Sequence, residues 1–353
     1  MQFKNGGFLT AACRSILRGS IVVRQRLHLF DPPESVGIIS VIDVHHSLLR
    51  LAHIHYLMNS FDFSKKQSDD LLRKWRVGSK EYLLGRFPMI MGIVNVTPDS
   101  FSDGGHFLET QTAVKHALSL SEQGADILDI GGESTRPGSE SIPAAEEIQR
   151  VIPVIEQVGR QTDVPMSIDT TKAEVARQAI QAGAVIVNDV SGLGFDTKMA
   201  YVCRDADVGV ICVHMQGVPQ TMQDNPTYDD VVGEICGFFS QRLQALENLG
   251  IPRERLVLDP GIGFGKTSDH NLEILANIRR FHDLGRPVLV GHSRKRFLAS
   301  VLDCSVDDRT HGTLGVAVAL AMQSTDIIRV HDVQATRNAL LAWHAIADRL
   351  DTN

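Results

Sequence analysis

Several features that would define a protein class are missing from this sequence. None of its five cysteines forms a CxxC pair with another (Cys13, Cys203, Cys212, Cys236 and Cys304), so neither a disulfide framework nor a zinc motif is indicated, and a reducing, cytoplasmic compartment is expected. No uninterrupted apolar run reaches about 18 residues, which argues against a membrane span and a membrane partner. The net charge of −7 supplies no basic stripe, so nucleic acid is not an expected partner.

Two glycine-rich phosphate-binding motifs are also absent. The segment Gly261–Thr267, GIGFGKT, ends like a P-loop, but Pro260 stands five positions before Gly265, where that motif requires glycine. The dinucleotide-binding spacing fails because Lys266 occupies the position of the last glycine. We interpret these glycines as permitting a tight turn and a close approach of the backbone to a flat ligand. No serine nucleophile elbow is visible, and no cysteine lies in a strand-end motif.

The N-terminal part of the chain differs from the rest. Residues 1–30 carry five basic residues and no acidic one, a pattern that suits an organelle transit peptide, although a later start at Met58 accounts for it equally well. Arg14 and Arg18 interrupt the apolar core that a secretory signal would need. Four histidines further on have no cysteine or carboxylate pattern beside them, so we interpret this stretch as an amphipathic segment or a poorly ordered extension rather than a metal site.

The most informative stretch runs from Met89 to Gly105, MIMGIVNVTPDSFSDGG. Its apolar opening, Met89–Val94, could be a strand buried on both faces or a piece of buried helix, but Pro88 before it and the turn residues after it favour a strand. We interpret the polar segment that follows as a mobile loop that presents ligands, and an ordinary polar turn is the alternative. The oxygen-bearing side chains of this segment are Asn95, Thr97, Asp99, Ser100, Ser102 and Asp103.

From residue 88 onward, apolar strands alternate with helices. Such alternation favours parallel strands joined by helical crossovers, and eight units fit a closed (β/α)8 TIM barrel. An open doubly wound sheet is the alternative, but the first strand-to-helix turn lacks its glycine fingerprint. Strands are predicted at 89–94, 127–132, 165–169, 184–189, 208–214, 256–259, 287–291 and 326–331. Helices are predicted near 110–123, 143–158, 172–181, 197–204, 228–249, 269–281, 294 onward, 312–323 and 334–347.

We therefore predict an α/β fold with two parts. Residues 75–350 form the (β/α)8 barrel domain, and residues 1–74 form an extension of uncertain structure. The barrel domain is expected to begin with a short hairpin, Trp75–Leu84, whose two strands turn at Gly78-Ser79. Residues 68–74 suggest a short charged helix before it.

Each predicted strand ends on a polar or charged side chain. In parallel barrels the carboxyl ends of the strands meet at one face, where the chemistry of such folds is placed. Helix capping would account for one or two of these residues but not for all of them. The sequence therefore predicts a convergent site for a small polar ligand. The strand-end residues are Asn95, Asp129, Asp169, Asn188, Asp189, His214, Asp259, Ser293, Lys295, Arg329 and His331.

These residue types suit two tasks. One task is to fix the edge of a nitrogen heterocycle, because a carboxylate accepts hydrogen bonds from an N–H and NH₂ pair. The residues of this kind are Asp129, Asp169, Asn188 and Asp259. Any one of them alone could instead be a cap or a supporting residue. The cationic strand-end residues, with Arg136 in a Ser-Thr-Arg-Pro-Gly turn, suit phosphate or carboxylate oxygens. With Asn95 as an oxygen ligand, the set suits a diphosphate held by Mg²⁺.

Taken together, the motifs resemble those of the dihydropteroate synthases, a family of folate-pathway enzymes. The resemblance covers about residues 75–347 and not residues 1–74, and the ordered set of motifs is highly specific. The matching stretches are NVTPDSFSDGG from Asn95, DIGGESTRPG from Asp129, SIDT from Ser167, NDVSG from Asn188, HMQG from His214, LDPGIGFGK from Leu258, GHSRK from Gly291 and RVHD from Arg329.

The resemblance implies a reaction and a set of residue roles. The family joins (7,8-dihydropterin-6-yl)methyl diphosphate to 4-aminobenzoate, giving 7,8-dihydropteroate and diphosphate, and its members are commonly homodimers. The pterin would lie against Asp129, Asp169, Asn188, Asp259 and Lys295. The diphosphate would meet Asn95 through Mg²⁺, together with Arg329 and His331. The aminobenzoate would lie beside Thr135, Arg136, Pro137, Phe264 and Ser293, under the loop that carries Phe101 and Asp103.

The resemblance also implies a dissociative mechanism, in which the C–O bond to diphosphate breaks first and the arylamine traps the pterin methylene cation. Mg²⁺, Arg329 and a helix N-terminus would stabilise the departing charge, and Asp169 and Asp103 would favour the cation. No strong base is needed, because an arylamine is a free nucleophile at neutral pH. Lys295 and Arg136 complete the expected catalytic set.

Two other functions stay open from the sequence. A methyltransferase that uses methyltetrahydrofolate would share the barrel and the pterin-edge carboxylates, but it has no need for the diphosphate site at Arg329 and His331 or for the turn at residues 134–138. A catalytically silent barrel with a histidine-bearing N-terminal binding segment is the second. The intact loop and strand-end motifs disfavour it.

Overall fold

The structure, a computed structural model, describes residues 72–85, 87–97, 105–135, 138–305 and 307–350. These residues belong to one unit, Ser64–Asn353. Apart from its last three residues, the expected extension over residues 1–74 lies outside the described part, so the domain division stays a prediction. Arg73 and Lys74 belong to a strand and not to the short helix expected there.

Eight parallel strands form a closed barrel, as the sequence predicts. Each strand pairs with the next one in chain order, and β10 returns to β3. An isolated parallel bridge between Leu258 and Val288 joins β8 to β9 and completes the circle. This sequential order excludes the open doubly wound sheet. The strands are β3 (Met89–Asn95), β4 (Ile127–Gly131), β5 (Met166–Asp169), β6 (Ile186–Asp189), β7 (Gly209–Val213), β8 (Leu256–Asp259), β9 (Leu289–Val290) and β10 (Ile327–Val330).

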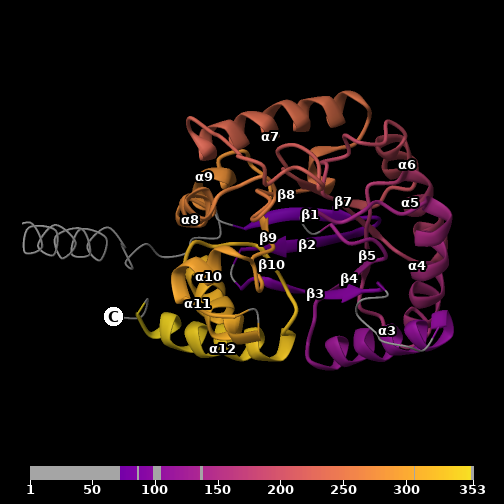
Figure 1. The fold of residues 1–353 in the computed structure, drawn as a ribbon, viewed down its shortest axis with the longest axis horizontal. Coiled ribbons are helices and arrows are strands. Elements are labelled where there is room, and N and C mark those ends of the chain that lie inside the picture. Colours follow the sequence, from indigo (N-terminus) through magenta and orange to yellow (C-terminus); the bar gives the residue numbers. More distant parts are fainter. Residues whose placement is uncertain (1–71, 86, 98–104, 136–137, 306, 351–353) are drawn as a thin grey trace, which may run out of the picture. The chain divides into compact units, whose positions relative to one another are not determined.

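Helices form a ring around the barrel strands (Figure 1). None of the described helices combines the length and apolar character needed to cross a membrane. They are α3 (Gly105–Glu122), α4 (Ala144–Val158), α5 (Ala173–Ala182), α6 (Met199–Asp205), α7 (Val231–Asn248), η3 (Arg253–Arg255), α8 (Ser268–Ala276), α9 (Arg279–His282), α10 (Phe297–Leu302), η4 (Asp307–Arg309), α11 (Thr310–Ala321) and α12 (Val333–Leu350).

The single helix predicted at 269–281 is wrong, because the chain breaks it into α8 and α9. Asn277 leaves helical geometry, with φ −121° and ψ 26°. Its side-chain Nδ2 donates to the backbone oxygen of Glu273 at 2.8 Å. Asparagine competes in this way for backbone groups that would otherwise continue a helix, which explains the break.

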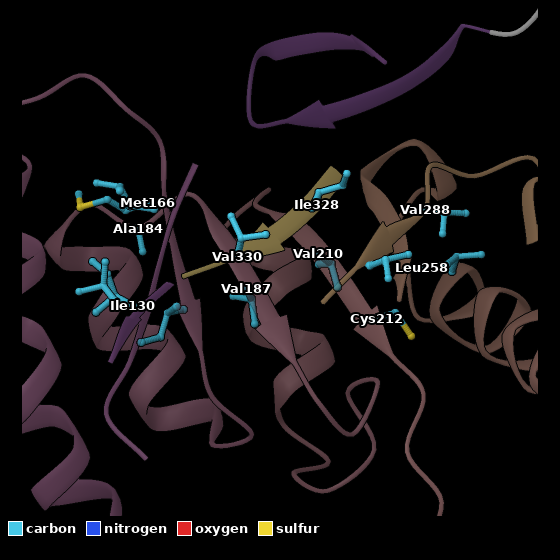
Figure 2. Packing of buried hydrophobic residues seen from close by; sticks show 14 of the residues in the cluster. Ile130, Met166, Ala184, Val187, Val210, Cys212, Leu258, Val288, Ile328 and Val330 are labelled. Atoms are coloured by element: carbon cyan, nitrogen blue, oxygen red, sulfur yellow. The ribbon is translucent and has the colours of Figure 1, made fainter. Parts of the chain in front are cut away.

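The barrel strands bury apolar side chains on both faces. Side chains alternate along a strand, so each strand contributes to two separate clusters. The outer cluster lies between the strands and the helices and includes Ile130 and Val187 (Figure 2). The inner cluster fills the barrel and includes Ile127 and Ile186. Burial on both faces explains why the strands appear in the sequence as continuous apolar runs.

A hairpin closes the amino-terminal end of the barrel. β1 (Arg73–Val77) and β2 (Lys80–Leu84) pair antiparallel around Gly78, whose φ of +55° suits the tight turn, so the predicted hairpin is confirmed. Trp75 is 0% exposed and joins the inner cluster. Its Nε1 donates to the backbone oxygen of Arg255 at 3.0 Å. The opposite, carboxyl end of the barrel is where the predicted site residues lie.

Candidate active site

Side-chain alternation brings the polar strand-end residues into the barrel. In β4, Ile127 belongs to the inner cluster, so Asp129, two positions later, also points inward at the carboxyl end. Asn95 follows the inner residue Met91 of β3 by four positions, so the same alternation points it inward. The pairs in β6, β8 and β10 are Ile186 with Asn188, Val257 with Asp259, and Ile327 with Arg329.

Two of the predicted strand-end residues do not belong to this interior set. His214 and Asp189 alternate with inner residues and lie on the outer side of their strands. The His214 ring packs edge-on against Phe238, with 4.9 Å between ring centres, and burial together with Lys266 lowers the pKa of His214 to about 3. Asp189 Oδ1 accepts the N–H and the hydroxyl of Ser191 at 2.8 and 2.6 Å. The expectation that every strand end contributes to one site is wrong at these two positions.

Arg329 lies at the centre of the site and joins residues from four strands. Its Nε donates to Asp129 Oδ2 at 2.6 Å, and its Nη2 donates to Asp169 Oδ2 at 2.8 Å. Asn188 Nδ2 donates to the same Asp129 oxygen at 3.0 Å. Four of the predicted substrate-binding residues are therefore in direct contact. We call this group the Arg329 cluster.

Two oxygens of the Arg329 cluster keep unused acceptor capacity. Asp129 is 0% exposed and Asn188 is 5% exposed. Even so, Asp129 Oδ1 and Asn188 Oδ1 receive no hydrogen bond from any described residue. A buried acceptor without a donor costs about 1–3 kcal/mol, so such atoms are rare unless a ligand completes them. Their position indicates a ligand that supplies N–H donors.

Burial shifts the ionisation of two site carboxyls. It raises the pKa of Asp169 to about 7, against the attraction of Arg329. It also raises the pKa of Asp259 to about 6, although the N–H of Gly261 donates to Asp259 Oδ1 at 2.8 Å. Both carboxyls therefore change protonation close to neutral pH, where the arrival of N–H donors would favour the ionised form.

Lys295 and Phe264 lie against each other beside the glycine segment that follows β8. Lys295 Nζ is 4.2 Å from the centre of the Phe264 ring, a cation–π contact. A Cβ on Gly263, whose φ is +82°, would lie 3.2 Å from Lys295 Cδ. A Cβ on Gly261 would lie 1.9 Å from the backbone oxygen of His214. The glycines thus permit a close approach, as predicted, but the atoms that approach them here belong to the protein itself.

Ser293 and His331 form a pair at the carboxyl ends of β9 and β10. Ser293 Oγ is 2.9 Å from His331 Nδ1 and also accepts the backbone N–H of His331 at 3.3 Å. Burial lowers the pKa of His331 to about 3, and the positive charges of Arg329 and Arg294 contribute to this decrease. At this pKa, His331 is a neutral hydrogen-bonding residue near pH 7.

The remaining predicted residues lie beside this core or outside the described part of the chain. Asn95 ends β3 and is half-buried. Thr135 is half-buried in the loop between β4 and α4. Four residues lie outside the described ranges, so their roles stay predictions: Phe101, Asp103, Arg136 and Pro137.

The side-chain oxygen of Asn95 suits Mg²⁺ that is carried by a phosphate ligand. Within the described ranges, no three His, Cys, Asp or Glu side chains gather into a metal site. Magnesium at phosphate sites commonly takes one or two protein oxygens, and phosphate oxygens and water fill its remaining positions. A single amide oxygen from Asn95, on the inner side of β3, is compatible with this mode of binding and not with an all-protein cage.

Sequence reasoning missed three charged residues close to the site. Lys266 is 3% exposed, and its Nζ lies 3.0 Å from His214 Nδ1 and 2.9 Å from the oxygen of Phe264. Burial lowers the pKa of Lys266 to about 7. Glu133 and Lys172 form an ion pair at 2.8 Å beneath the loop that carries Thr135. Lys266 is 52 positions from His214, and Lys172 is 39 positions from Glu133, so no local pattern could reveal these two contacts.

The barrel is similar in sequence and fold to proteins of known activity. Residues 91–331 match a family described as "Pterin binding enzyme". The dihydropteroate synthase of Escherichia coli (strain K12) is 46% identical over 253 residues, which are 72% of this chain and 89% of that protein. Xanthomonas albilineans dihydropteroate synthase with 4-aminobenzoic acid matches at 44% identity and a TM-score of 0.73, covering 78% of this chain and 98% of that one. The enzyme from the same organism in complex with 7,8-dihydropteroate matches at 42% identity and a TM-score of 0.69, covering 77% and 98%.

Proposed function

The chain belongs to the dihydropteroate synthases within the pterin-binding enzyme family, and we propose that it joins (7,8-dihydropterin-6-yl)methyl diphosphate to 4-aminobenzoate, giving 7,8-dihydropteroate and diphosphate. It is thus a transferase of folate synthesis. The observation that carries the reaction to this chain is the Arg329 cluster, with its two unused acceptors on Asp129 and Asn188. A pterin ring presents N–H and NH₂ donors along one edge, which match such acceptors.

The pterin ring is held by the interior carboxyls and the amide. Asp129 Oδ1 and Asn188 Oδ1 accept ring N–H groups, and Asp169 and Asp259 accept further donors once they ionise. Lys295 is proposed to bridge the pterin and the arylamine, and its contact with Phe264 supports this role. The ring thereby presents its methylene carbon toward the mouth of the barrel.

The diphosphate departs toward Arg329, His331 and Asn95. Arg329 keeps its charge because Asp129 and Asp169 outweigh the effect of burial and raise its pKa, and it has further N–H donors beyond the two that serve these carboxylates. When the Ser293 hydroxyl donates to Nδ1 of neutral His331, the Nε2–H stays available as a donor. Asn95 would hold Mg²⁺, which would supply positive charge against the charge that develops on the diphosphate oxygens.

The reaction is a substitution at the pterin methylene carbon. The C–O bond breaks, and its electron pair leaves with the diphosphate. Ionised Asp169 stabilises the cation that remains, and the lone pair of the arylamine forms the new C–N bond before the nitrogen releases its proton. Thr135, Ser293 and Phe264 position the arylamine, and Asp103 and Arg136 are proposed to complete the set from their loops.

The test is diphosphate release by the purified full-length chain, supplied with dihydropterin diphosphate and Mg²⁺, with and without 4-aminobenzoate. We expect release to require the arylamine, to yield 7,8-dihydropteroate and to stop when the metal is chelated. Binding of the pterin without any release would contradict the proposal and would instead support a silent barrel. Release that continues unchanged in the presence of a chelator would remove Mg²⁺ from it.

A second copy of the chain is proposed to cover α11. After Thr313 this helix carries only apolar residues and glycine, which is typical of a buried helix, although Gly315 on it is exposed. On the adjacent α10, Val301 and Leu302 are 55% and 44% exposed. A Cβ on Gly315 would meet no atom within 4 Å, so Gly315→Arg adds a charge without disturbing the protomer. We expect light scattering to give a dimer for the wild type and a monomer for this variant, and a dimeric variant would place the interface elsewhere.

A cytoplasmic location is also proposed. The four cysteines in the described residues are all free thiols, namely Cys203, Cys212, Cys236 and Cys304. Free thiols suit a reducing compartment. Cell fractionation with an antibody against the chain tests this, and recovery in an organelle fraction would favour the transit-peptide interpretation of residues 1–30.

A further inference from the structure

Glu133 closes the base of the loop that carries Thr135. Its Oε1 accepts the backbone N–H of Ile142 at 2.8 Å, and its Oε2 receives Lys172 Nζ at 2.8 Å. The first of these bonds joins the start of the loop to its end. Within the loop, Ser139 Oγ donates to the backbone oxygen of Ser134 at 2.5 Å. The Glu133 side chain is 12% exposed, so this closure takes place largely out of water.

Lys172 connects this loop to two other segments. It stands at the N-terminus of α5, three positions after Asp169, and its Nζ also lies 2.7 Å from Glu147 Oε2. Glu147 is 0% exposed and belongs to the first turn of α4. The two helices lie side by side on one flank of the barrel (Figure 1). We call Glu133, Lys172 and Glu147 the ion triad.

The segment that leads into the loop is fixed against α4 as well. A Cβ on Gly132 would lie 2.7 Å from Val151 Cγ1 and 3.1 Å from Glu147 Cγ, so only glycine fits there. Arg150 Nη1 donates to the backbone oxygen of Gly132 at 2.8 Å. The chain therefore enters the loop from a rigid position. The direction it takes afterwards depends on the Glu133 carboxylate.

The charges of the ion triad make this an unusual way to support a loop. Burial raises the pKa of Glu147 despite its contact with Lys172, whereas the bonds from Lys172, Ser141 and Ile142 outweigh burial and lower the pKa of Glu133. Removing charged groups from water costs free energy that apolar packing of similar volume would avoid. Charge-assisted hydrogen bonds, however, are directional and set the orientation of a carboxylate, which apolar contacts do not.

We propose that Glu133 is a positioning residue for the arylamine substrate: through Lys172 it holds the loop that carries Thr135 in a defined position relative to Asp169. The inference rests on the proposed function, because it assigns Thr135 to the arylamine side and Asp169 to the pterin side. It adds a link between the two substrate sites. Lys172 provides this link, since it follows Asp169 on the same strand-to-helix turn and contacts Glu133 directly.

The test separates the two substrates by steady-state kinetics. Glu133→Gln keeps a side-chain oxygen for the Ile142 N–H but removes the charge that pairs with Lys172. We expect the KM for 4-aminobenzoate to rise about tenfold, in line with the loss of one charge-assisted hydrogen bond. The KM for dihydropterin diphosphate is expected to stay within about twofold of wild type. Equilibrium binding of 4-aminobenzoate, measured by calorimetry with the pterin site filled, is expected to weaken in parallel.

Two further variants of the ion triad keep the proposal testable if Glu133→Gln folds poorly. Lys172→Met removes the same ion pair from the other side and is expected to reproduce the effect on 4-aminobenzoate. Lys172→Arg retains the cation and is expected to restore most of the affinity. The double variant Glu133→Gln/Lys172→Met is expected to raise the KM for 4-aminobenzoate no further than Lys172→Met alone, because the Glu133–Lys172 pair is already lost there and both variants also lose the Lys172–Glu147 pair.

The matched control is Glu156→Gln. It also replaces a glutamate carboxylate by an amide, but at a position on α4 that is not part of the ion triad. Glu156 is 50% exposed, and its nearest cation, Arg160, is 4.0 Å away on the same helix. We expect both KM values to be those of the wild type. If Glu133→Gln raises both KM values equally, or lowers only the thermal midpoint, the ion triad is structural and the proposal is overturned. Failure of the wild type itself to need the arylamine would instead overturn the proposed function.

Discussion

Each end of the barrel contains a buried arginine–carboxylate pair, and the two pairs differ in how many carboxylate oxygens accept a hydrogen bond. At the amino-terminal end, Asp326 is 0% exposed, and both of its oxygens receive donors, from Arg73 Nε at 2.9 Å and from the N–H of Val288 at 2.8 Å. At the carboxyl end, Asp129 is equally buried, but Arg329 reaches only Oδ2, and no described residue donates to Oδ1. A completed carboxylate stabilises the fold, whereas one with a free acceptor is ready for a ligand.

The two ends of the barrel also differ in the side chains that line them. Trp75 and Val77 of the hairpin join the inner cluster and close the amino-terminal end with apolar side chains. At the other end the inward positions are carboxyls, an amide and a guanidinium. The structure therefore separates stability from binding along a single barrel axis, and variants at the two ends are expected to have separable effects.

The largest expected effect is loss of turnover at the carboxyl end. Lys295→Ala and Asp169→Asn are each expected to reduce kcat/KM by about 10³-fold, because each removes a charge directed at the reacting atoms. The thermal midpoint of Asp169→Asn is not expected to fall near neutral pH, since burial disfavours the ionised carboxyl that it replaces. Diphosphate release and thermal unfolding of the same samples check both points. Near-normal turnover in either purified variant would remove that residue from the catalytic set.

The opposite result is expected at the amino-terminal end. Trp75→Ala deletes the largest side chain of the hairpin and is expected to lower the free energy of unfolding by about 3–5 kcal/mol, while kcat per folded molecule is unchanged. Urea unfolding and active-site titration measure the two quantities. Leu83→Ala is the matched control, because Leu83 is 60% exposed on the same hairpin, and it is expected to change stability by less than about 0.5 kcal/mol. A lower kcat in folded Trp75→Ala would show that the two ends are coupled.

The smallest expected effect is a pH dependence of pterin binding. The pKa of Asp169 is about 7 in the folded chain, so the carboxyl accepts fewer hydrogen bonds below this pH and more above it. Pterin affinity is therefore expected to rise about tenfold between about pH 6 and about pH 8, as measured by calorimetry. The contribution of Asp169 to stability runs the other way: because its pKa is raised above the ordinary value of 3.8 for an aspartate, that contribution is full below about pH 4 and is lost as the pH rises through about 7.

Asp169→Asn is the control for this pH dependence. An amide has no proton to lose in this range, so both the rise in affinity and the loss of stability are expected to be much smaller in the variant. If the pH dependence of pterin binding were unchanged in Asp169→Asn, another group would control it. Asp259, whose pKa is about 6, would be the next residue to test.

Most of the fold could be predicted because its signals are local. The apolar run Met89–Val94 and its bounding prolines predict β3, and the Gly78-Ser79 pair predicts the hairpin turn. The break in the helix over 269–281 was not predictable in the same way, because an asparagine such as Asn277 can either continue a helix or donate its side-chain amide to a nearby backbone oxygen, here that of Glu273. The structure shows the second outcome.

The sequence predicted which residues belong to the candidate site better than it predicted which of them are in contact. Asp129, Asn188 and Asp259 lie inside the barrel because they follow inner apolar residues by two positions. His214 and Asp189 each follow an inner residue by one position, so side-chain alternation places them outside the barrel. The strand-end pattern did not take this alternation into account. Asp103 and Arg136 lie outside the described residues and stay predictions.

The order of strands and helices, the kinds of side chain at the strand ends and the family follow from the amino-acid sequence, because they depend on local periodicity and on short motifs. Only the tertiary structure decided which polar groups meet. Arg329 pairs with Asp129 across 200 positions of sequence, and Lys172 with Glu133 across 39, because barrel closure and helix packing bring separate strand ends together. Burial in that closed barrel also decided the charge of His331, since the desolvation that lowers its pKa exists only once the surrounding strands are in place.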